Sequence, residues 1–258
     1  MINKFINDPW LHTSKLKKQY LKNQPYSHIV MPNFINAKIL NRVLKEFPDL
    51  SIQKKDFVKN FDKSTEMKLA SKGSNLLSAS AKNLIYFLNS DIFLNYLQEL
   101  TGIKETLISD PYLSGGGYHE IKNGGLLKIH ADFNKHPDLN LDRRINLLIY
   151  LNKNWNESWG GDFQMFDENM RGPIKKVFPH FNTCVIFSTT SKTYHGHPDP
   201  LSCPNDKSRK SIALYYFSTG RPKSENSKTH STLFKKRTGD NFSSKENFLS
   251  KINKFFKS

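Results

Sequence analysis

The chain changes its pattern of apolar and polar positions along its length. Apolar residues recur every three to four positions over residues 36–48 and again over residues 74–100, with Gly102 just beyond the second pattern. This spacing is typical of helices with one apolar face. Residues 26–35 favour a strand, and residues 1–25 favour an irregular arm. The helical faces are too apolar to stand alone in water, so we expect them to pack on a sheet.

The sequence pattern favours β-strands between about residues 107 and 217, where short apolar runs alternate with Gly, Pro and Asn. About eight strands at this spacing predict an antiparallel sandwich or barrel, and a jelly roll is the common eight-stranded solution. We therefore predict a mainly β fold with α-helices. Residues 105–222 would form the jelly-roll core, and residues 1–104 would supply an arm and supporting helices of the same domain.

The last part of the chain, residues 223–258, is rich in Ser, Lys and Asn and predicts a solvated linker or extended wrap up to about residue 243. A basic amphipathic helix is then expected at the C-terminus. Its apolar face would carry Phe248, Leu249, Ile252, Phe255 and Phe256. We favour docking of this face on its own domain over binding to anionic lipid or to a partner.

Charge and cysteine content restrict the possible binding partners and cellular compartment of the protein. The formal net charge of +16 favours anionic partners, although Lys supplies most of it, which makes it a weak indication of a nucleic-acid ligand. Two cysteines, Cys184 and Cys203, are too few for a disulfide framework. No signal-peptide pattern opens the chain, and no run approaches the roughly 20 apolar residues of a membrane span. We expect a cytoplasmic, soluble protein whose oligomeric state the sequence leaves open.

A candidate metal site begins with His130 and Asp132 in the run LLKIHADF. Residues two apart on a strand leave the same face of the sheet, so both side chains converge. With a second His from a distant strand they would form the facial triad of two His and one carboxylate. That triad leaves positions open on the metal and is typical of non-haem Fe(II) oxygenases. The H-x-D spacing alone is common by chance.

The third ligand has three candidates in the downstream sequence, His180, His195 and His197. We favour His195, because it follows a strong strand and sits in a tight turn bounded by Gly and Pro. His197 is the rival, although the following Pro198 biases it toward an extended conformation at the mouth of the site.

A basic residue farther along the chain is expected to face the same interior. In the strand RKSIALYYF, Arg209 shares one face with Ser211, Ala213 and Tyr215. A buried guanidinium is costly unless an anion pairs with it, and its planar fork suits a carboxylate. The alternative is a surface Arg209, with Lys210 facing inward.

These motifs, taken in order, resemble the catalytic domain of 2-oxoglutarate and Fe(II)-dependent dioxygenases, specifically the prolyl 4-hydroxylase-like group. The resemblance covers about residues 108–222 and rests on five segments. They are H-A-D (130–132), RRINLLIYLNKNW (143–155), GGDFQMFD (160–167), NTCVIFSTTSKTYHGHP (182–198) and RKSIALYYFSTGRP (209–222). The resemblance implies a double-stranded β-helix, which is this family's form of the jelly roll.

The resemblance also implies roles for residues. His130, Asp132 and His195 match the iron ligands, Arg209 matches the residue that binds the distal carboxylate of 2-oxoglutarate, and Tyr150 matches a tyrosine that bonds the same carboxylate. A core aromatic is the alternative for Tyr150. The implied reaction is an oxidoreductase reaction in which Fe(II), O2 and 2-oxoglutarate hydroxylate an aliphatic carbon and release succinate and CO2. Ascorbate would keep the iron reduced.

The substrate stays open at this point. A prolyl residue in a peptide is the first expectation, and a small molecule such as an amino acid, sugar or natural-product intermediate is the alternative; the Lys-rich surroundings favour an acidic substrate. Asp132 retains the carboxylate that related halogenases lack, which favours hydroxylation. Related nucleic-acid demethylases show a second Arg where this chain has Tyr215, which disfavours a nucleic-acid substrate. From another class, a non-catalytic metal-binding jelly-roll module is the remaining alternative.

Overall fold

A computed structural model describes residues 1–242 of the chain. The helices are α1 (Thr13–Lys22), α2 (Ala37–Lys45), α3 (Ala79–Leu88) and α4 (Asp91–Thr101). The strands are β1 (His28–Pro32), β2 (Val58–Lys63), β3 (Glu66–Ser71), β4 (Ile108–Ser109), β5 (Gly117–Ile121), β6 (Leu126–Ala131), β7 (Asp142–Tyr150), β8 (Phe163–Phe166), β9 (Lys175–Val177), β10 (Thr183–Ser188), β11 (Tyr194–His197), β12 (Arg209–Ser218) and β13 (Leu233–Phe234). α-Helix is thus confined to the first part of the described chain, and strands dominate the rest.

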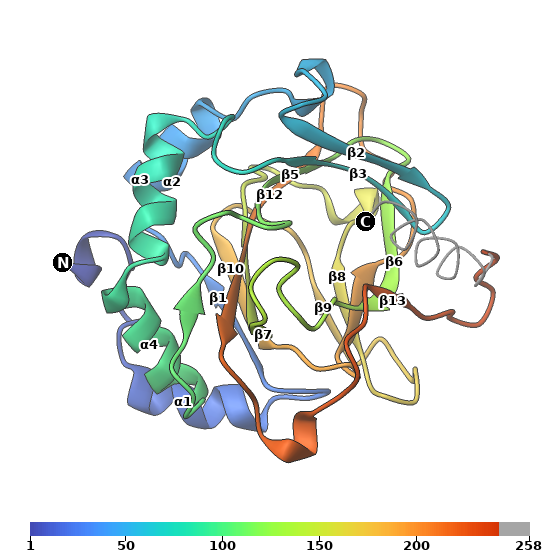
Figure 1. Ribbon diagram of the computed structural model, residues 1–258. Coiled ribbons are helices and arrows are strands. Elements are labelled where there is room, and N and C mark those ends of the chain that lie inside the picture. Colours follow the sequence, from blue (N-terminus) through green and yellow to red (C-terminus); the bar gives the residue numbers. More distant parts are fainter. Residues whose placement is uncertain (243–258) are drawn as a thin grey trace.

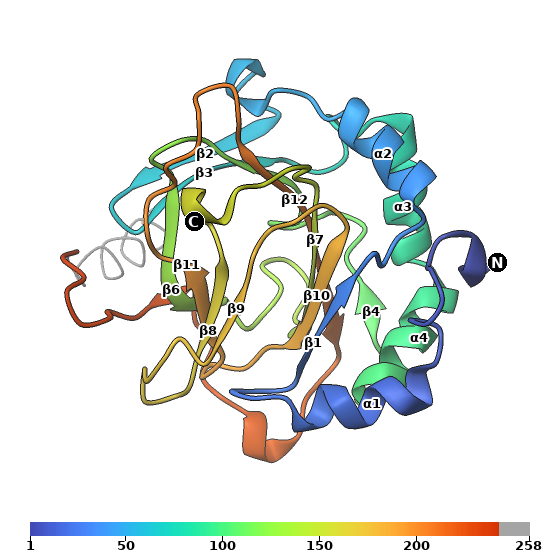
Figure 2. The same cartoon turned by 180° about the vertical axis from the view of Figure 1, so that it is seen from behind.

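The strands of residues 1–242 form a single 13-stranded sheet in which the named strand pairs are antiparallel. Along its main path the order is β1-β10-β7-β12-β5-β3-β6-β11-β8-β9. The sheet curls into a nearly closed barrel, and the four α-helices line one side of it (Figures 1 and 2). The predicted mainly β fold with a jelly-roll core and supporting N-terminal helices is confirmed.

The main core lies between the helices and the outer face of the sheet. On β7, Ile145, Leu147 and Ile149 all belong to this core and are fully buried. From the helix side, Phe93 of α4 places its ring 6.1 Å from that of Tyr216 on β12. The expectation that the apolar helices pack on a sheet is therefore correct.

The inner face of the sheet holds a second, separate core. It is made of Tyr150, Phe163, Met165, Val177, Val185 and Phe187. Because strand side chains alternate, β7 sends one set of residues to the helices and the next to the barrel interior. The candidate site lies in the barrel interior beside this second core, at the end where polar side chains replace apolar ones.

Two segments differ from the sequence-based expectations. The arm predicted as irregular contains helix α1, whose only buried residues are Leu16 and Tyr20. Tyr20 is fixed there because its hydroxyl and the Ser188 hydroxyl lie 2.7 Å apart. The hairpin of β2 and β3 was not predicted at all. Its strands are mostly polar and incompletely buried, so the period-two pattern is weak.

The segment after residue 222 wraps back onto the sheet. Its strand β13 pairs with β6, where Phe234 lies opposite His130 and Leu233 opposite Ala131. The predicted C-terminal amphipathic helix lies outside the described residues, and the domain boundaries at residues 104 and 222 stay predictions. Within residues 1–242, every helix is too short or too polar to cross a membrane.

Candidate metal centre

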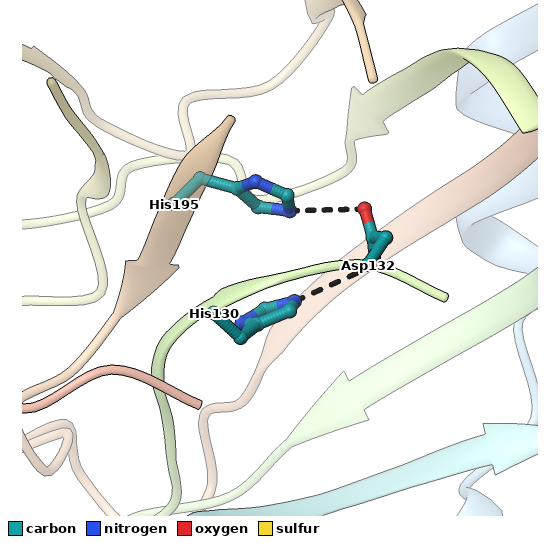
Figure 3. A group of neighbouring side chains, drawn as sticks. All are labelled: His130, Asp132 and His195. Carbon is teal, nitrogen blue, oxygen red and sulfur yellow. Dashed lines mark ion pairs between the residues drawn. The ribbon is translucent and has the colours of Figure 1, made fainter. Parts of the chain in front are cut away.

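Three side chains with metal-binding atoms meet inside the barrel. His130 lies on β6, Asp132 follows just after the strand, and His195 lies on β11 directly opposite His130 in the antiparallel pairing. One candidate ligand atom from each lies within 4.8 Å of the others. Figure 3 shows both imidazoles directed at the carboxylate, with Nε2 to carboxylate distances of 3.6 Å for His130 and 3.2 Å for His195. Within residues 1–242 this is the one such group of three or more His, Cys, Asp or Glu side chains.

Backbone carbonyls orient both imidazoles. The Nδ1–H of His130 donates to the Lys128 carbonyl at 2.8 Å, and the Nδ1–H of His195 donates to the Thr193 carbonyl at 3.0 Å. A carbonyl can only accept, so each ring keeps its lone pair on Nε2, the nitrogen that faces Asp132. This arrangement of outer hydrogen bonds is usual for histidines that bind metals.

Asp132 is held as a carboxylate. Asn146 donates from Nδ2 to its Oδ2 at 2.7 Å, and the Arg143 guanidinium lies 3.3 Å from the same oxygen. Burial alone would raise the pKa of Asp132, but Arg143 and the two histidines hold it well below its usual range. Burial lowers the pKa of His195, which Asp132 offsets only in part. Two imidazoles beside one carboxylate are a donor set that suits a divalent cation such as Fe(II).

The structure distinguishes the candidates for the third ligand. His180 lies at the surface, where its Nε2 is 3.0 Å from the carboxylate of Glu157. His197 is buried on the same strand as His195, but it does not join His130 and Asp132. The structure therefore groups His195 with the other two residues. Its role as a ligand remains a proposal.

Arg209 lines the same cavity, at the start of β12. Its Nε–H donates to the Gly161 carbonyl at 2.8 Å, and Nη2–H donates to the Tyr150 hydroxyl at 3.3 Å. Arg209 is only 5% exposed and forms no ion pair with any residue from 1 to 242. A buried cation that lacks a protein anion fits the carboxylate of a small ligand. The alternative in which Lys210 faces inward is wrong, because it is Arg209 that lines the cavity.

Gly161 allows this placement of Arg209. Its φ is +75°, and a Cβ there would lie 2.7 Å from Leu201 and 3.1 Å from Cδ of Arg209. A side chain would be strained by the backbone angle and would also displace the guanidinium. The Gly pair before β8 therefore shapes the cavity wall as well as the entry to the strand.

Three polar or charged residues that line the cavity were not predicted from the sequence: Arg143, Asn146 and Lys68. Asn146 could have been found, because it is four residues from Tyr150 and so shares its strand face. Arg143 could not, since regular alternation puts it on the helix side. The pairing of β7 with β12 shifts register there: Tyr216 opposes Ile145, but Phe217 opposes Arg143. This bulge turns Arg143 inward.

An outer chamber of about 370 Å³ adjoins the metal centre. His130, Asp132, Arg143 and Lys68 line both the chamber and the inner cavity. His119 also lines both. Its Nε2–H donates to the Gly115 carbonyl at 3.0 Å, and burial lowers its pKa to about 3. The site thus has an inner cavity lined by Arg209 and a larger chamber beside it that does not include Arg209.

Comparison with known proteins places this arrangement among oxygenases. The model of the 2OG-Fe(II) oxygenase superfamily matches residues 116–217, a range that contains every site residue predicted from the sequence. Prolyl 3-hydroxylase OGFOD1 of Xenopus laevis is 26% identical over 202 residues, which are 76% of this chain and 36% of that protein. The chain therefore spans about a third of the length of this relative.

Two solved structures show the same fold. A prolyl hydroxylase of Trichoplax adhaerens, solved with a hypoxia-inducible-factor peptide fragment, has a TM-score of 0.57 and 18% identity, with 81% of this chain and 90% of that chain covered. A prolyl 4-hydroxylase of Pseudomonas putida has a TM-score of 0.51 and 14% identity, with 81% and 99% covered.

Proposed function

We propose that this chain, which belongs to the 2OG-Fe(II) oxygenase superfamily, hydroxylates an aliphatic carbon of its substrate, with a prolyl residue in a peptide as the first candidate. One observation carries the proposal. A single cavity joins the group of His130, Asp132 and His195 to Arg209, which is buried and has no ion pair within residues 1–242. Such a cavity can hold a metal ion at one end and the far carboxylate of 2-oxoglutarate at the other.

In this proposal His130, Asp132 and His195 bind Fe(II), and Arg209 and Tyr150 bind the distal carboxylate of 2-oxoglutarate. When bound, iron and 2-oxoglutarate supply the oxidative chemistry that converts O2, 2-oxoglutarate and substrate to succinate, CO2 and alcohol. The protein orients these groups and excludes water. Phe163 and Phe187 form an apolar wall of the cavity, and Tyr150 packs in the same apolar cluster.

The proposal is tested by succinate release that depends on Fe(II) and 2-oxoglutarate, measured over pools of peptides and metabolites. His130→Ala should reduce this release to background, because a ligand and its open coordination geometry are lost. The matched control is His12→Ala, which removes an exposed histidine paired with Asp8. Full metal-dependent turnover in His130→Ala would refute the assigned centre. Absence of turnover and of 2-oxoglutarate binding in the metal-loaded wild type would favour a non-catalytic module.

The same assay separates peptide hydroxylation from hydroxylation of a small molecule. We also propose ascorbate as the auxiliary reductant, so its omission should shorten the linear phase of succinate release. A cytoplasmic location is supported by the two cysteines of residues 1–242, Cys184 and Cys203, which are both free and buried. Cell fractionation checks that location.

We further propose that the substrate carries an acidic group near the hydroxylated carbon. Lys59, Lys68, Lys72 and Arg143 line the outer chamber, against two carboxylates, Asp132 and Glu66. Glu66 is already paired with Lys68 at 2.9 Å. Arg143 is 1% exposed and stacked over Tyr215; its Nη2 faces Asp132, and its Nη1 has no hydrogen-bond partner among residues 1–242. A chamber with an excess of positive side chains and a guanidinium Nη1 that can still donate favours a carboxylate or phosphate on the substrate.

This preference is measurable with peptide pairs that differ only in an acidic or neutral residue beside the target. The acidic member should have a kcat/KM about tenfold higher, the effect of one charge-assisted hydrogen bond. The ratio should fall as salt rises and should shrink in Lys68→Gln, while Lys153→Gln, remote from the chamber, should keep it. Equal values for both peptides at low salt would refute an acidic preference.

A further inference from the structure

His197 is a buried residue of the cavity to which the proposed function gives no role. It is 3% exposed and lies at the end of β11, two residues beyond His195. Neither of its ring nitrogens, Nδ1 and Nε2, has a hydrogen-bond partner among residues 1–242. Buried polar groups in folded proteins are nearly always hydrogen-bonded, so two orphaned nitrogens on one ring indicate a missing partner.

The backbone fixes where this ring points. His195 and His197 are two apart on a strand, so both side chains face the cavity. Strand β6 bulges at this point, because His195 pairs with His130 and His197 pairs with Leu127. Gly196 permits the close crossing, since a Cβ there would lie 2.6 Å from the Leu127 carbonyl oxygen. The histidine is therefore held against the cavity by a glycine that no larger residue could replace without displacing β6.

The surroundings specify the kind of partner. His197 and Arg209 line the same inner cavity, together with Ser211 and Leu127. Asp132, the one acidic residue in this lining, already faces His130, His195 and Arg143. A neutral imidazole has one N–H to donate, and the adjacent guanidinium makes an anion the favourable acceptor.

We propose that His197 donates a hydrogen bond to the distal carboxylate of 2-oxoglutarate, as a third binding group beside Arg209 and Tyr150. This inference rests on the proposed function, because it assumes that 2-oxoglutarate occupies the cavity. It assigns His197 to the far end of the co-substrate and not to the metal. The two ends can be separated with a ligand that possesses only one of them.

The experiment is calorimetric titration of Mn(II)-loaded protein, which binds ligands without turnover. 2-Oxoglutarate is compared with 2-oxobutyrate, which keeps the keto acid and lacks the distal carboxylate. His197→Leu should raise the Kd for 2-oxoglutarate about tenfold and change the Kd for 2-oxobutyrate by less than about twofold. His197→Asn and His197→Gln place an amide N–H near the Nδ1 and Nε2 positions, so one of them should recover part of the affinity.

The other outcomes overturn the inference in different ways. An unchanged Kd for 2-oxoglutarate in His197→Leu would mean that the ring is a packing residue. Equal weakening of both ligands would place His197 at the keto-acid end, and loss of Mn(II) binding would make it a metal ligand. If the wild type itself fails to bind 2-oxoglutarate, the proposed function fails, and this inference fails with it.

Discussion

Strand β7 presents two opposite environments within a few residues. Ile145, Leu147 and Ile149 pack into the core beneath the helices, which is built mainly of aliphatic and aromatic side chains. Asn146 and Tyr150 face the barrel interior, where Asn146 bonds Asp132 and Tyr150 bonds Arg209. Among residues 1–242, the interior keeps buried side-chain nitrogens of Arg143 and His197 without a hydrogen-bond partner, and none of the three isoleucine and leucine side chains on the helix side needs one.

This difference separates stability from function along one strand. Apolar burial stabilises the fold whether or not a ligand is present. Buried polar groups without partners reduce stability until a ligand binds them. Substitutions on the helix side should therefore change the free energy of unfolding, and substitutions on the interior side should change ligand affinity.

The largest effect is expected for Ile149→Ala. The side chain is fully buried in the main core, so its truncation should lower the free energy of unfolding by about 2–5 kcal/mol. Urea denaturation followed by circular dichroism measures this loss. Mn(II) and 2-oxoglutarate affinities of the folded fraction should stay within about twofold of wild type. A tenfold loss of affinity would show that the two faces of β7 are coupled.

Asn146→Ala should act on the interior side. It removes the 2.7 Å hydrogen bond to Asp132 and the acceptor of the Arg143 Nε–H, at 2.9 Å. Loss of such an outer partner weakens metal binding by about 10–100-fold, which a Mn(II) titration followed by electron paramagnetic resonance will measure. Asn152→Ala is the matched control, because this buried asparagine bonds the Pro179 carbonyl instead of a site residue. Equal losses in both variants would indicate general loosening of the barrel.

Tyr150→Phe should have a smaller effect, confined to the co-substrate. The variant keeps the ring and removes the hydroxyl that accepts from Arg209, so the Kd for 2-oxoglutarate should rise about five- to tenfold. The free energy of unfolding should change by less than about 1 kcal/mol. Tyr20→Phe removes another buried hydroxyl, bonded to Ser188, and should leave this Kd unchanged. A Tyr150→Phe protein with wild-type affinity would make Tyr150 a packing residue.

The sequence predicted the parts of the fold that follow from periodicity. The apolar patterns of residues 36–48 and 74–100 correspond to α2, α3 and α4, and the short β-rich runs correspond to the strands of the barrel. Helix α1 was missed because two buried residues in ten make little periodic signal. The β2–β3 hairpin was missed because Lys59 and Lys68 reach the outer chamber, so polar residues occupy positions where a buried strand would be apolar.

The site was predictable to the extent that side chains alternate regularly. Strand alternation placed Arg209 on one face with Ser211, Ala213 and Tyr215, and the H-x-D spacing placed His130 and Asp132 on a common face; the structure has Arg209, His130 and Asp132 in one cavity. The inward position of the Arg143 side chain could not be predicted, because it depends on a bulge in β7 that arises from pairing with β12. The lack of hydrogen-bond partners for the His197 ring could not be predicted from the sequence either. It depends on which side chains the folded barrel brings around the ring.

The segment of residues 233–240 packs along the edge of β6, and its ion pairs are expected to contribute less to stability than the core does. Asp240 lies 2.9 Å from the Lys128 ammonium and accepts a 2.9 Å hydrogen bond from the backbone N–H of Arg237. Burial would raise the pKa of Asp240, but the Arg237 and Lys128 side chains lower it. A carboxyl with a depressed folded pKa adds stability above its unfolded pKa and loses this contribution as the pH falls through the folded pKa.

The smallest effect is therefore expected from acidification or from Asp240→Asn. In the wild type, lowering the pH below about 4 should speed amide exchange at Lys235, whose N–H donates to the Ile129 carbonyl at 2.8 Å. Asp240→Asn should show the faster exchange already at pH 7, with less than about 1 kcal/mol lost from the free energy of unfolding. Rates are compared after correction for intrinsic exchange at each pH. If protection at Lys235 is the same at pH 3 and pH 7, backbone pairing of β13 with β6 holds the segment, and the ion pairs contribute nothing to it.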